Sequence, residues 1–347
     1  SIILKELVTT GTFSFKHFYE RRIRRILPVL LFVMLVSLPF AWMYLIPSGF
    51  VDFSKSILYS LGFSSNYYFH YSGQEYGALD GLFKPFLHTW SLSVEEQYYI
   101  IFPIFLMISW RLGLRFILFI LVITFFVSLA AAFWGSYNKP SATFYLLPTR
   151  AWELLIGAFV GILCHKYQLP TSNSIRNGLS ILGIGAILFS IFIFNESTPF
   201  PGIYGLVPTL GTALVILFAT PGTWVNFFLS FRVFVGIGLI SYSIYLWHQP
   251  IFTFWRHYNL LEKTALQMVL LSALTISLSY LTYRFIEKPF RLRSPFITRN
   301  QVFSLSILFM SVIFTIGLIG NFGNFSKSIT YPLDYEPDRG TLRSDSW

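Results

Sequence analysis

Apolar runs long enough to cross a lipid bilayer recur along almost all of this 347-residue sequence. About 20 apolar helical residues span the hydrocarbon core of a bilayer, where backbone groups must be hydrogen-bonded within the protein. Only 12% of the residues are charged, about half the usual share in soluble domains. We therefore predict an all-α, polytopic transmembrane helical bundle of about nine or ten helices. The predicted spans are Leu27–Ile46, Glu96–Ser109, Leu114–Trp134, Tyr145–His165, Gly178–Phe194, Tyr204–Ala219, Val233–Trp255, Ala265–Tyr283 and Gln301–Gly320.

The basic residues predict how the bundle is oriented. Of the 25 Lys and Arg residues, 16 lie in the segments 5–25, 111–115, 164–176, 220–232 and 284–299. The positive-inside rule places these segments in the cytoplasm and the alternate loops outside. The net charge of the protein is +10. We interpret the excess basic residues as setting the orientation of the protein in the membrane and contacting anionic lipid head groups, in preference to binding nucleic acid.

One apolar segment, Phe53–His70, is interrupted by polar residues and does not fit this alternation. Leu27–Ile46 leaves the cytoplasm and Glu96–Ser109 returns to it, so an even number of crossings must lie between them. We therefore predict that Phe53–His70 lies along the outer interface or re-enters the membrane. The segment that starts at His88 would then lie near the outer side.

The stretch His88–Tyr99 reads HTWSLSVEEQYY and leads directly into an apolar segment. Placing an ionisable side chain at the edge of a bilayer costs free energy, so such residues are usually either ion-paired or functional. A His and a Glu can act together as general base and orienting carboxylate, which makes His88 and Glu95 catalytic candidates. The alternative is structural, with Glu95 and Glu96 stabilising a helix N-terminus at the interface. Both interpretations stay open on these residues alone.

Basic side chains are concentrated just before the first predicted span. Arg21, Arg24 and Arg25 share one helical face at positions i, i+3 and i+4. Such a face could bind phosphate groups through bidentate guanidinium contacts. The alternative is a stop signal and lipid anchor at the cytoplasmic surface.

A polar stripe interrupts the predicted span Val233–Trp255. Ser241, Tyr245 and His248 fall on one helical face at i, i+4 and i+7. Polar stripes inside a membrane bundle usually line a cavity or a pathway. Hydrogen bonding between neighbouring helices is the alternative.

Two oppositely charged pairs are spaced one helical turn apart, Arg150 with Glu153 and Arg284 with Glu287. We predict mainly structural ion pairs for both. No metal site is predicted, because the six His residues are scattered and no H-x-x-x-H or C-x-x-C spacing occurs. A P-loop and a G-x-S-x-G elbow are also absent from the sequence.

Five blocks in this order resemble the transmembrane acyltransferase family 3, the membrane O-acyltransferases that modify bacterial polysaccharides. The blocks are Phe18–Pro28, His88–Tyr99, Thr149–Glu153, Ser241–His248 and Arg284–Arg291. The resemblance runs from about Ser1 to Gly320. The sequence of the second block is similar to that of the family branch whose members carry a periplasmic SGNH-hydrolase-like domain after the last helix.

The resemblance implies that an acetyl group passes from cytoplasmic acetyl-CoA to a hydroxyl of an extracytoplasmic glycan. Lipopolysaccharide O-antigen is the most typical acceptor in that branch, and peptidoglycan and other glycans are also acceptors in the family. The location implied is the bacterial inner membrane. In this scheme the diphosphate of CoA would be held by Arg21, Arg24 and Arg25, assisted by Arg284 or Arg291. The path to the acceptor would be lined by Glu95, His88, Tyr245 and His248.

We expect residues 1–321 to form the transmembrane core and residues 322–347 to form a periplasmic tail that leads to an SGNH-like domain. The principal His of the family lies in a first helix that this sequence does not include, and Ser1–Leu7 looks like the end of the second helix. Two alternatives remain open. One is a transporter or flippase for a lipid-linked glycan, and the other is an inactive fragment or a membrane scaffold.

Overall fold

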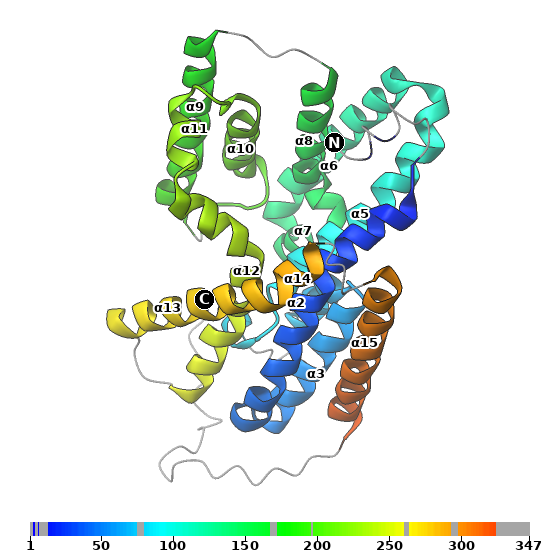
Figure 1. The fold of residues 1–347 in the computed structure, drawn as a ribbon, viewed down its shortest axis with the longest axis vertical. Helices are drawn as coiled ribbons and strands as arrows, with labels where there is room; N and C mark the ends of the chain where they lie inside the picture. Colours follow the sequence, from blue (N-terminus) through cyan, green and yellow to red (C-terminus); the bar gives the residue numbers. More distant parts are fainter. Residues whose placement is uncertain are drawn as a thin grey trace.

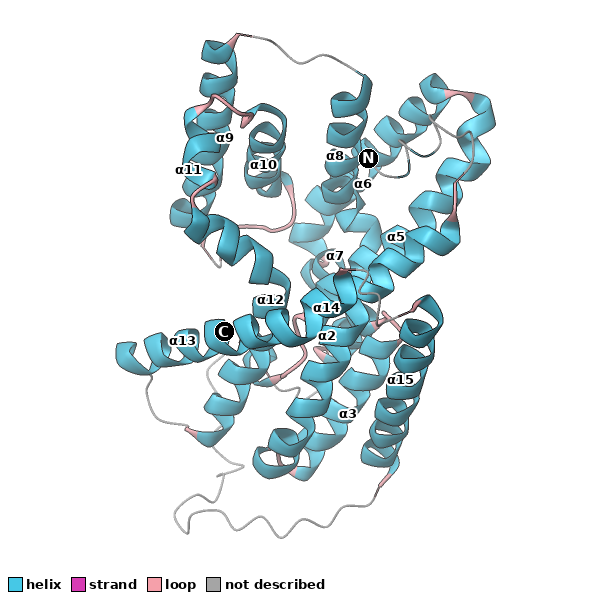
Figure 2. Cartoon of the chain, in the orientation of Figure 1, coloured by secondary structure: helices cyan, strands magenta, loops and turns pink. Residues whose placement is uncertain are grey.

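The computed structural model describes Ile3, Glu6 and residues 13–74, 80–166, 172–195, 197–259, 264–292 and 298–323. Across these residues the chain forms helices and loops and contains no β-strand (Figures 1 and 2). The predicted all-α fold is confirmed. Most of Ser1–Leu7 and of the predicted tail lies outside the described residues.

Six helical stretches of the described chain are long and apolar enough to cross a membrane, so this is a multi-pass membrane protein. Four are single helices, namely α2 (Phe15–Tyr44), α6 (Leu114–Asn138), α9 (Asn173–Ile193) and α15 (Arg299–Phe322). The other two join consecutive elements: α7 (Pro140–Tyr145) with α8 (Leu147–Lys166), and α13 (Ala265–Thr282) with η4 (Tyr283–Glu287) and α14 (Lys288–Arg291).

The remaining predicted spans correspond to helices that are shorter or more polar. They are α5 (Thr89–Ser109), α10 (Leu206–Phe218) and α12 (Arg232–Tyr258). α10 has 13 residues, whereas α5 and α12 are long enough to cross but carry the polar stretches singled out in the sequence. Short connecting elements complete the described chain: η1 (Gly81–Phe83), η2 (Trp110–Leu112), η3 (Ile203–Gly205) and α11 (Trp224–Leu229).

The interrupted segment Phe53–His70 forms two short helices, α3 (Pro47–Leu61) and α4 (Ser65–Ser72). Neither is among the helices long and apolar enough to cross a membrane. Pro47 starts α3 directly after the end of α2, and α3 packs along α2 and α15 (Figure 1). The chain therefore turns back along α2 here, and whether the segment re-enters the membrane or lies along its interface stays a prediction. The side of the membrane on which this happens stays a prediction.

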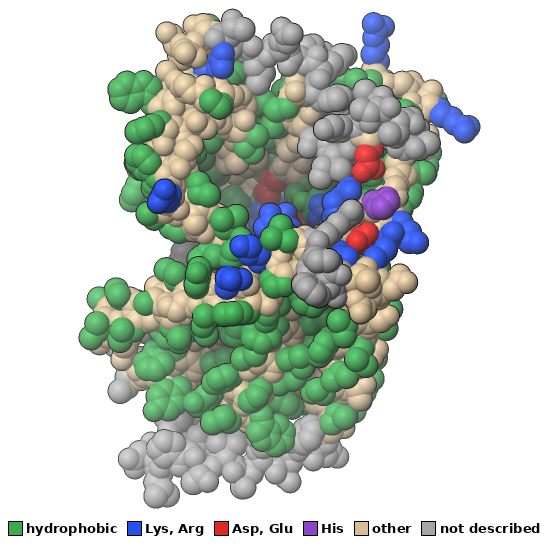
Figure 3. All heavy atoms as spheres, viewed as in Figure 1, with side chains coloured by type: hydrophobic (Ala, Val, Ile, Leu, Met, Phe, Trp, Pro, Cys, Tyr) green, Lys and Arg blue, Asp and Glu red, His purple; other side chains and the backbone are tan. Residues whose placement is uncertain are grey.

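The largest core is formed by apolar side chains of α2, α3, α5, α12 and α15. Leu30 and Met34 of α2 pack with Ile57 of α3, Leu246 of α12 and Ile313 of α15. Figure 3 shows apolar side chains covering the lower half of the molecule, with basic and acidic side chains gathered in a band across the middle. This band overlies the region where α2 begins and where α14 and α15 meet it (Figure 1).

Helices α9 and α10 form a close pair because glycines face each other at their contact. A Cβ atom on Gly183 would lie 2.7 Å from the carbonyl oxygen of Gly211. Gly183→Val is expected to separate the two helices and destabilise the protein by about 1–3 kcal/mol. Thermal unfolding of the purified protein in detergent measures this as a lower midpoint.

Gly185→Val provides the matched control, because a Cβ atom on Gly185 meets no atom within 4 Å. It adds the same side chain to the same helix. Equal unfolding midpoints for the two variants would contradict the close contact between α9 and α10.

Candidate functional site

Helices α2, α5 and α12 enclose a cavity of about 260 Å³. It is lined by Arg22, Arg25, Ile26, Leu92, Glu95, Tyr99, Ser241, Tyr242 and Tyr245. Three predicted site residues, Arg25, Glu95 and Tyr245, thus come together although they are far apart in the sequence. Ser241 joins them, so two of the three residues of the predicted polar stripe on α12, Ser241 and Tyr245, line the cavity, whereas His248 does not.

Two arginines of α2 supply the positive charge of this cavity. Arg25 is exposed and makes no ion pair or hydrogen bond within the described part of the chain. The guanidinium of Arg22 lies 3.2 Å from Oε1 of Glu96 and 3.0 Å from the centre of the Tyr99 ring. Arg22 was not predicted as a site residue, although its spacing of i, i+3 with Arg25 would have placed both on one face.

The other two predicted phosphate ligands do not line the cavity. Nη2 of Arg21 lies 3.3 Å from Oε1 of Glu6. Arg24 is only 5% exposed, and its Nε donates to Oε1 of Glu20 at 3.0 Å. Glu20 also lies 3.4 Å from Nε of Arg299. Of the predicted face, only Arg25 reaches the cavity, because Arg24 is held by a carboxylate one turn earlier on its own helix.

Arg24→Met is expected to lower the free energy of unfolding by about 3 kcal/mol, because it removes one partner of a buried ion pair. Arg21→Met is the control. Its partly exposed ion pair should contribute no more than about 1 kcal/mol. Unfolding by SDS titration in mixed micelles compares the two, and an equal loss in both variants would show that the buried Arg24–Glu20 pair stabilises the fold no more than the partly exposed pair does.

His88 lies behind the cavity, next to Tyr245. The Tyr245 hydroxyl donates to the His88 backbone oxygen at 2.5 Å and lies 2.9 Å from Oγ of Ser91. The centre of the His88 ring is 5.0 Å from that of Tyr245 and 5.3 Å from that of His248. α5 and α12 therefore hold two imidazoles and a phenol in contact.

The His88 imidazole is buried and has no hydrogen-bond partner at either nitrogen within the described part of the chain. His88 precedes the first residue of α5, and only 8% of it is exposed. Burial, together with the neighbouring His248, lowers the pKa of His88 well below its usual value. The ring is therefore neutral at pH 7, with one nitrogen available to accept a proton and the other able to donate one.

The predicted ion pair of Arg150 and Glu153 is confirmed, with 2.7 Å between Nη1 and Oε1. The prediction for Arg284 and Glu287 is wrong. Glu287 instead lies 3.5 Å from Nη1 of Arg291 and accepts a hydrogen bond from Ser243 at 2.9 Å. The reason is that residues 283–287 form a π-helical turn, which changes the angular spacing of side chains from that of an α-helix.

Two further predictions concern what the site binds, namely the role of Arg284 and Arg291 as phosphate ligands and the question of a metal site. Arg284 and Arg291 are not among the residues that line the cavity, and Arg284 lies over the ring of Phe285, 5.9 Å from its centre. In the part of the chain that the structure describes, no group of three or more His, Cys, Asp or Glu side chains is arranged to hold a metal ion. The cavity offers guanidinium groups, which suit an anionic ligand.

A family model described as an acyltransferase domain (Acyl_transf_3) matches residues 7–284. The chain belongs to acyltransferase family 3. The matched range contains α2, α5 and α12 and therefore the whole cavity lining. No solved structure matches this member of the family.

Curated relatives are similar over most of this acyltransferase family 3 chain. "Putative O-acetyltransferase SACOL0978" of Staphylococcus aureus (strain COL) is 28% identical over 95% of this chain and 57% of its own length. "Peptidoglycan O-acetyltransferase OatA" of Listeria monocytogenes is 29% identical over 84% of this chain and 49% of its own length. An uncharacterised protein of Haemophilus influenzae is 35% identical over 62% of this chain and 91% of its own length. The chain thus spans about half the length of the first two relatives.

Proposed function

We propose that this chain is the membrane core of an O-acetyltransferase that moves an acetyl group from acetyl-CoA to a hydroxyl of a cell-envelope glycan. Membership of acyltransferase family 3 and the names of two relatives support this proposal. The observation that carries it is a cavity that combines two arginines and a carboxylate and lies next to a buried imidazole without a partner.

Arg22 and Arg25 are the proposed ligands of the CoA phosphates. Guanidinium groups bind phosphate oxygens through paired, charge-assisted hydrogen bonds. Arg25 has its donors available in the cavity, and Arg22 is held in place by Glu96 and Tyr99. A volume of about 260 Å³ is small for a whole cofactor. The cavity would therefore hold the part of CoA that carries the thioester, with the rest of the molecule outside.

The transfer breaks the thioester C–S bond and forms an ester bond between the acetyl carbon and the acceptor oxygen. The proton of the acceptor hydroxyl must leave, and the sulfur of CoA gains one. The neutral His88 ring is suited to accept and return this proton, because it has an unpaired nitrogen. Glu95 is the carboxylate that shares the cavity with both arginines and would orient the proton donor. Tyr245 fixes the backbone of His88.

The acceptor is proposed to be an extracytoplasmic glycan, and the protein to lie in the bacterial inner membrane with its C-terminal tail in the periplasm. The motif resemblance favours lipopolysaccharide O-antigen. The relative from Listeria is named for peptidoglycan, which supports peptidoglycan as the second candidate. Acetate released by mild alkali from each purified glycan separates the two.

The test of this function is deletion of the complete gene, followed by complementation with the natural protein. We expect ester-linked acetate on one envelope glycan to disappear and return, with a mass shift of one acetyl group per modified sugar. Unchanged acetate would overturn the proposal. If lipid-linked glycan then accumulated on the cytoplasmic side of the deletion strain, the transporter alternative would replace it.

A further inference from the structure

Helix α12 presents hydrogen-bond donors along one side to the segment 81–88, which leads into α5. Each donor contacts a backbone oxygen of this segment. The donors follow one another at about one helical turn, so they form a stripe along the helix. They are Tyr245, Gln249, Thr253, Arg256 and His257. The stripe starts at Tyr245, which also lines the cavity, and runs from there toward the C-terminal end of α12.

Gln249 and Thr253 make the central contacts of the stripe. Nε2 of Gln249 donates to the backbone oxygen of Lys84 at 3.2 Å and lies 3.4 Å from that of Gly81. One side chain thus contacts the segment at the first residue of η1 and at the residue that follows η1. Oγ1 of Thr253 is buried and donates to the backbone oxygen of Leu82 at 3.2 Å.

The last two donors hold the same short helix, η1. Nη1 of Arg256 also donates to the backbone oxygen of Leu82, at 3.1 Å, and Nε2 of His257 donates to that of Phe83 at 3.0 Å. The His257 ring packs edge-on against the Phe83 ring, with 5.3 Å between their centres. Turns leave backbone oxygens without strand or long-helix partners, and the side chains of α12 pair them here.

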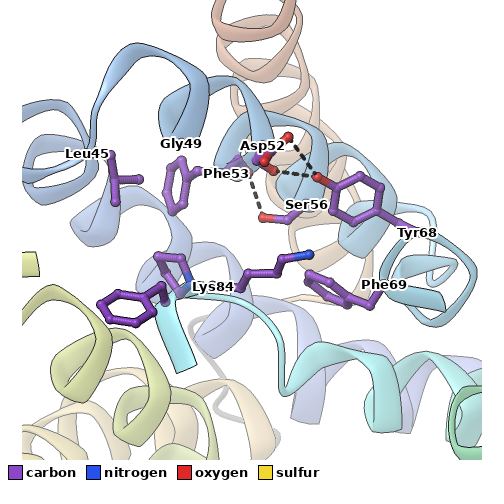
Figure 4. Close-up of a pocket in the computed structure, with 10 residues that line it drawn as sticks. Leu45, Gly49, Asp52, Phe53, Ser56, Tyr68, Phe69 and Lys84 are labelled. Carbon is purple, nitrogen blue, oxygen red and sulfur yellow. Dashed lines mark hydrogen bonds between the residues drawn. The ribbon is translucent and has the colours of Figure 1, made fainter. Parts of the chain in front are cut away.

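Lys84 connects the segment to a second element, α4. Its side chain is buried, and Nζ donates to Oγ of Ser72 at 3.1 Å and lies 6.0 Å from the centre of the Phe69 ring. Figure 4 shows the Lys84 side chain extending from the segment toward Phe69. The backbone oxygens of the segment are therefore held by α12, while its buried lysine is held by α4.

The segment ends at His88, the imidazole of the candidate site. The Tyr245 hydroxyl contacts the His88 backbone oxygen, but neither ring nitrogen has a hydrogen-bond partner within the described residues. The place of the ring thus depends on the backbone that carries it and on packing against the rings of Tyr245 and His248. Both rings and all the donors of the stripe belong to α12. One helix therefore sets where the imidazole lies relative to the cavity.

We propose that Gln249 is a positioning residue for His88. By holding the segment 81–88 at two backbone oxygens, Gln249 keeps the imidazole where it can take the proton of the acceptor hydroxyl. Gln249 does not line the cavity and acts only through the segment. This inference rests on the proposed O-acetyltransferase function and adds a residue outside the cavity on which the rate of transfer depends.

Gln249→Met keeps the length of the side chain and removes its contacts with the two backbone oxygens. We expect kcat for glycan acetylation to fall about tenfold, since a misplacement of about 1 Å can cost up to about 10²-fold. The KM for acetyl-CoA should stay within about twofold, because Arg22 and Arg25 are untouched. Gln249→His keeps an N–H donor and should recover part of kcat. Initial rates are measured with the complete natural protein in membrane vesicles and the unacetylated glycan of the deletion strain.

Trp247→Phe is the matched control on the same helix. Nε1 of the buried Trp247 donates to Oγ1 of Thr282 in α13 at 2.9 Å, so this variant loses a buried hydrogen bond that does not hold the segment. We expect a lower thermal unfolding midpoint, as in Gln249→Met, but a kcat within about twofold of wild type. An equal fall of kcat in both variants would assign the effect to lost stability and overturn the proposal.

Thr253→Val is the second variant, should Gln249→Met fail to accumulate in the membrane. Valine has nearly the shape of threonine and removes only the donor to the backbone oxygen of Leu82. We expect the same pattern, a lower kcat with a KM for acetyl-CoA within about twofold. A wild-type kcat in this variant would contradict the proposal.

Amide hydrogen exchange of the peptide that contains residues 81–88 tests the same contact without activity. Gln249→Met should raise its exchange by about 2–10-fold, the factor for one lost hydrogen bond, and Trp247→Phe should leave it unchanged. Unchanged exchange in Gln249→Met would overturn the proposal, as would raised exchange with a normal kcat. A wild type that neither binds acetyl-CoA nor acetylates a glycan would refute the proposed function. An active wild type with a normal Gln249→Met variant would refute the positioning role alone.

Discussion

Glu95→Gln is expected to slow acetyl transfer by about 10²-fold or more, because Glu95 would orient the proton donor in a proton-transfer step that itself contributes about 10²–10⁴-fold. Glu95 is the acidic residue that lines the cavity together with Arg22 and Arg25. Glutamine has the same shape and still accepts a hydrogen bond, but it cannot take a proton or carry a negative charge. Binding of acetyl-CoA should be equal or tighter, because a negative charge next to the phosphate ligands is removed.

The measurement is a single-turnover rate of glycan acetylation with the complete protein at saturating acetyl-CoA. Glu96→Gln is the matched control, because Glu96 is the adjacent residue but contacts Arg22, and its amide oxygen can still accept from that guanidinium. We expect the control to lose much less activity. A Glu95→Gln variant as fast as wild type would remove Glu95 from the mechanism and leave it an interfacial role.

Arg25→Ala is expected to raise the KM for acetyl-CoA by about 10–100-fold, the factor for hydrogen bonds to a charged group worth about 1.5–3 kcal/mol. Arg25 is exposed in the cavity and has no partner in the described chain that would compete with phosphate. The kcat should change little, because the contact is made equally in the ground state and in the transition state.

Arg21→Ala is the control for this experiment, since Arg21 pairs with Glu6 and does not line the cavity. It removes a similar charge four residues earlier on the same helix. Initial rates at varied acetyl-CoA concentration distinguish the two variants. Equal increases in KM would mean that the basic segment acts through its overall charge, and the specific role of Arg25 would be lost.

Six of the nine predicted spans follow from the sequence alone, because apolar runs of membrane length have few alternatives to a helix. The Arg150–Glu153 ion pair is also a local property, set by residues one helical turn apart. Arg25, Glu95 and Tyr245 could be named from motifs, but only the packing of α2, α5 and α12 shows that they share a cavity.

Other site features depend on tertiary contacts and were not predictable. Arg22 and Arg24 are both arginines of one helix, yet Arg22 lines the cavity and Arg24 is held by Glu20. Glu287 forms its ion pair with Arg291 because of a π-helical turn, which the sequence pattern did not predict.

The cavity also has a consequence for how this protein is made. Its first wall comes from α2 and its last from α12, so Tyr245 leaves the ribosome about 150 residues after Glu95, which is on the order of 10–30 s at bacterial rates of synthesis. During that interval Glu95 and the arginines of α2 reside in the membrane without the helix that covers them. The site is therefore a feature that only a fully inserted chain possesses, and chains arrested before α12 would show unshielded charge to membrane proteases.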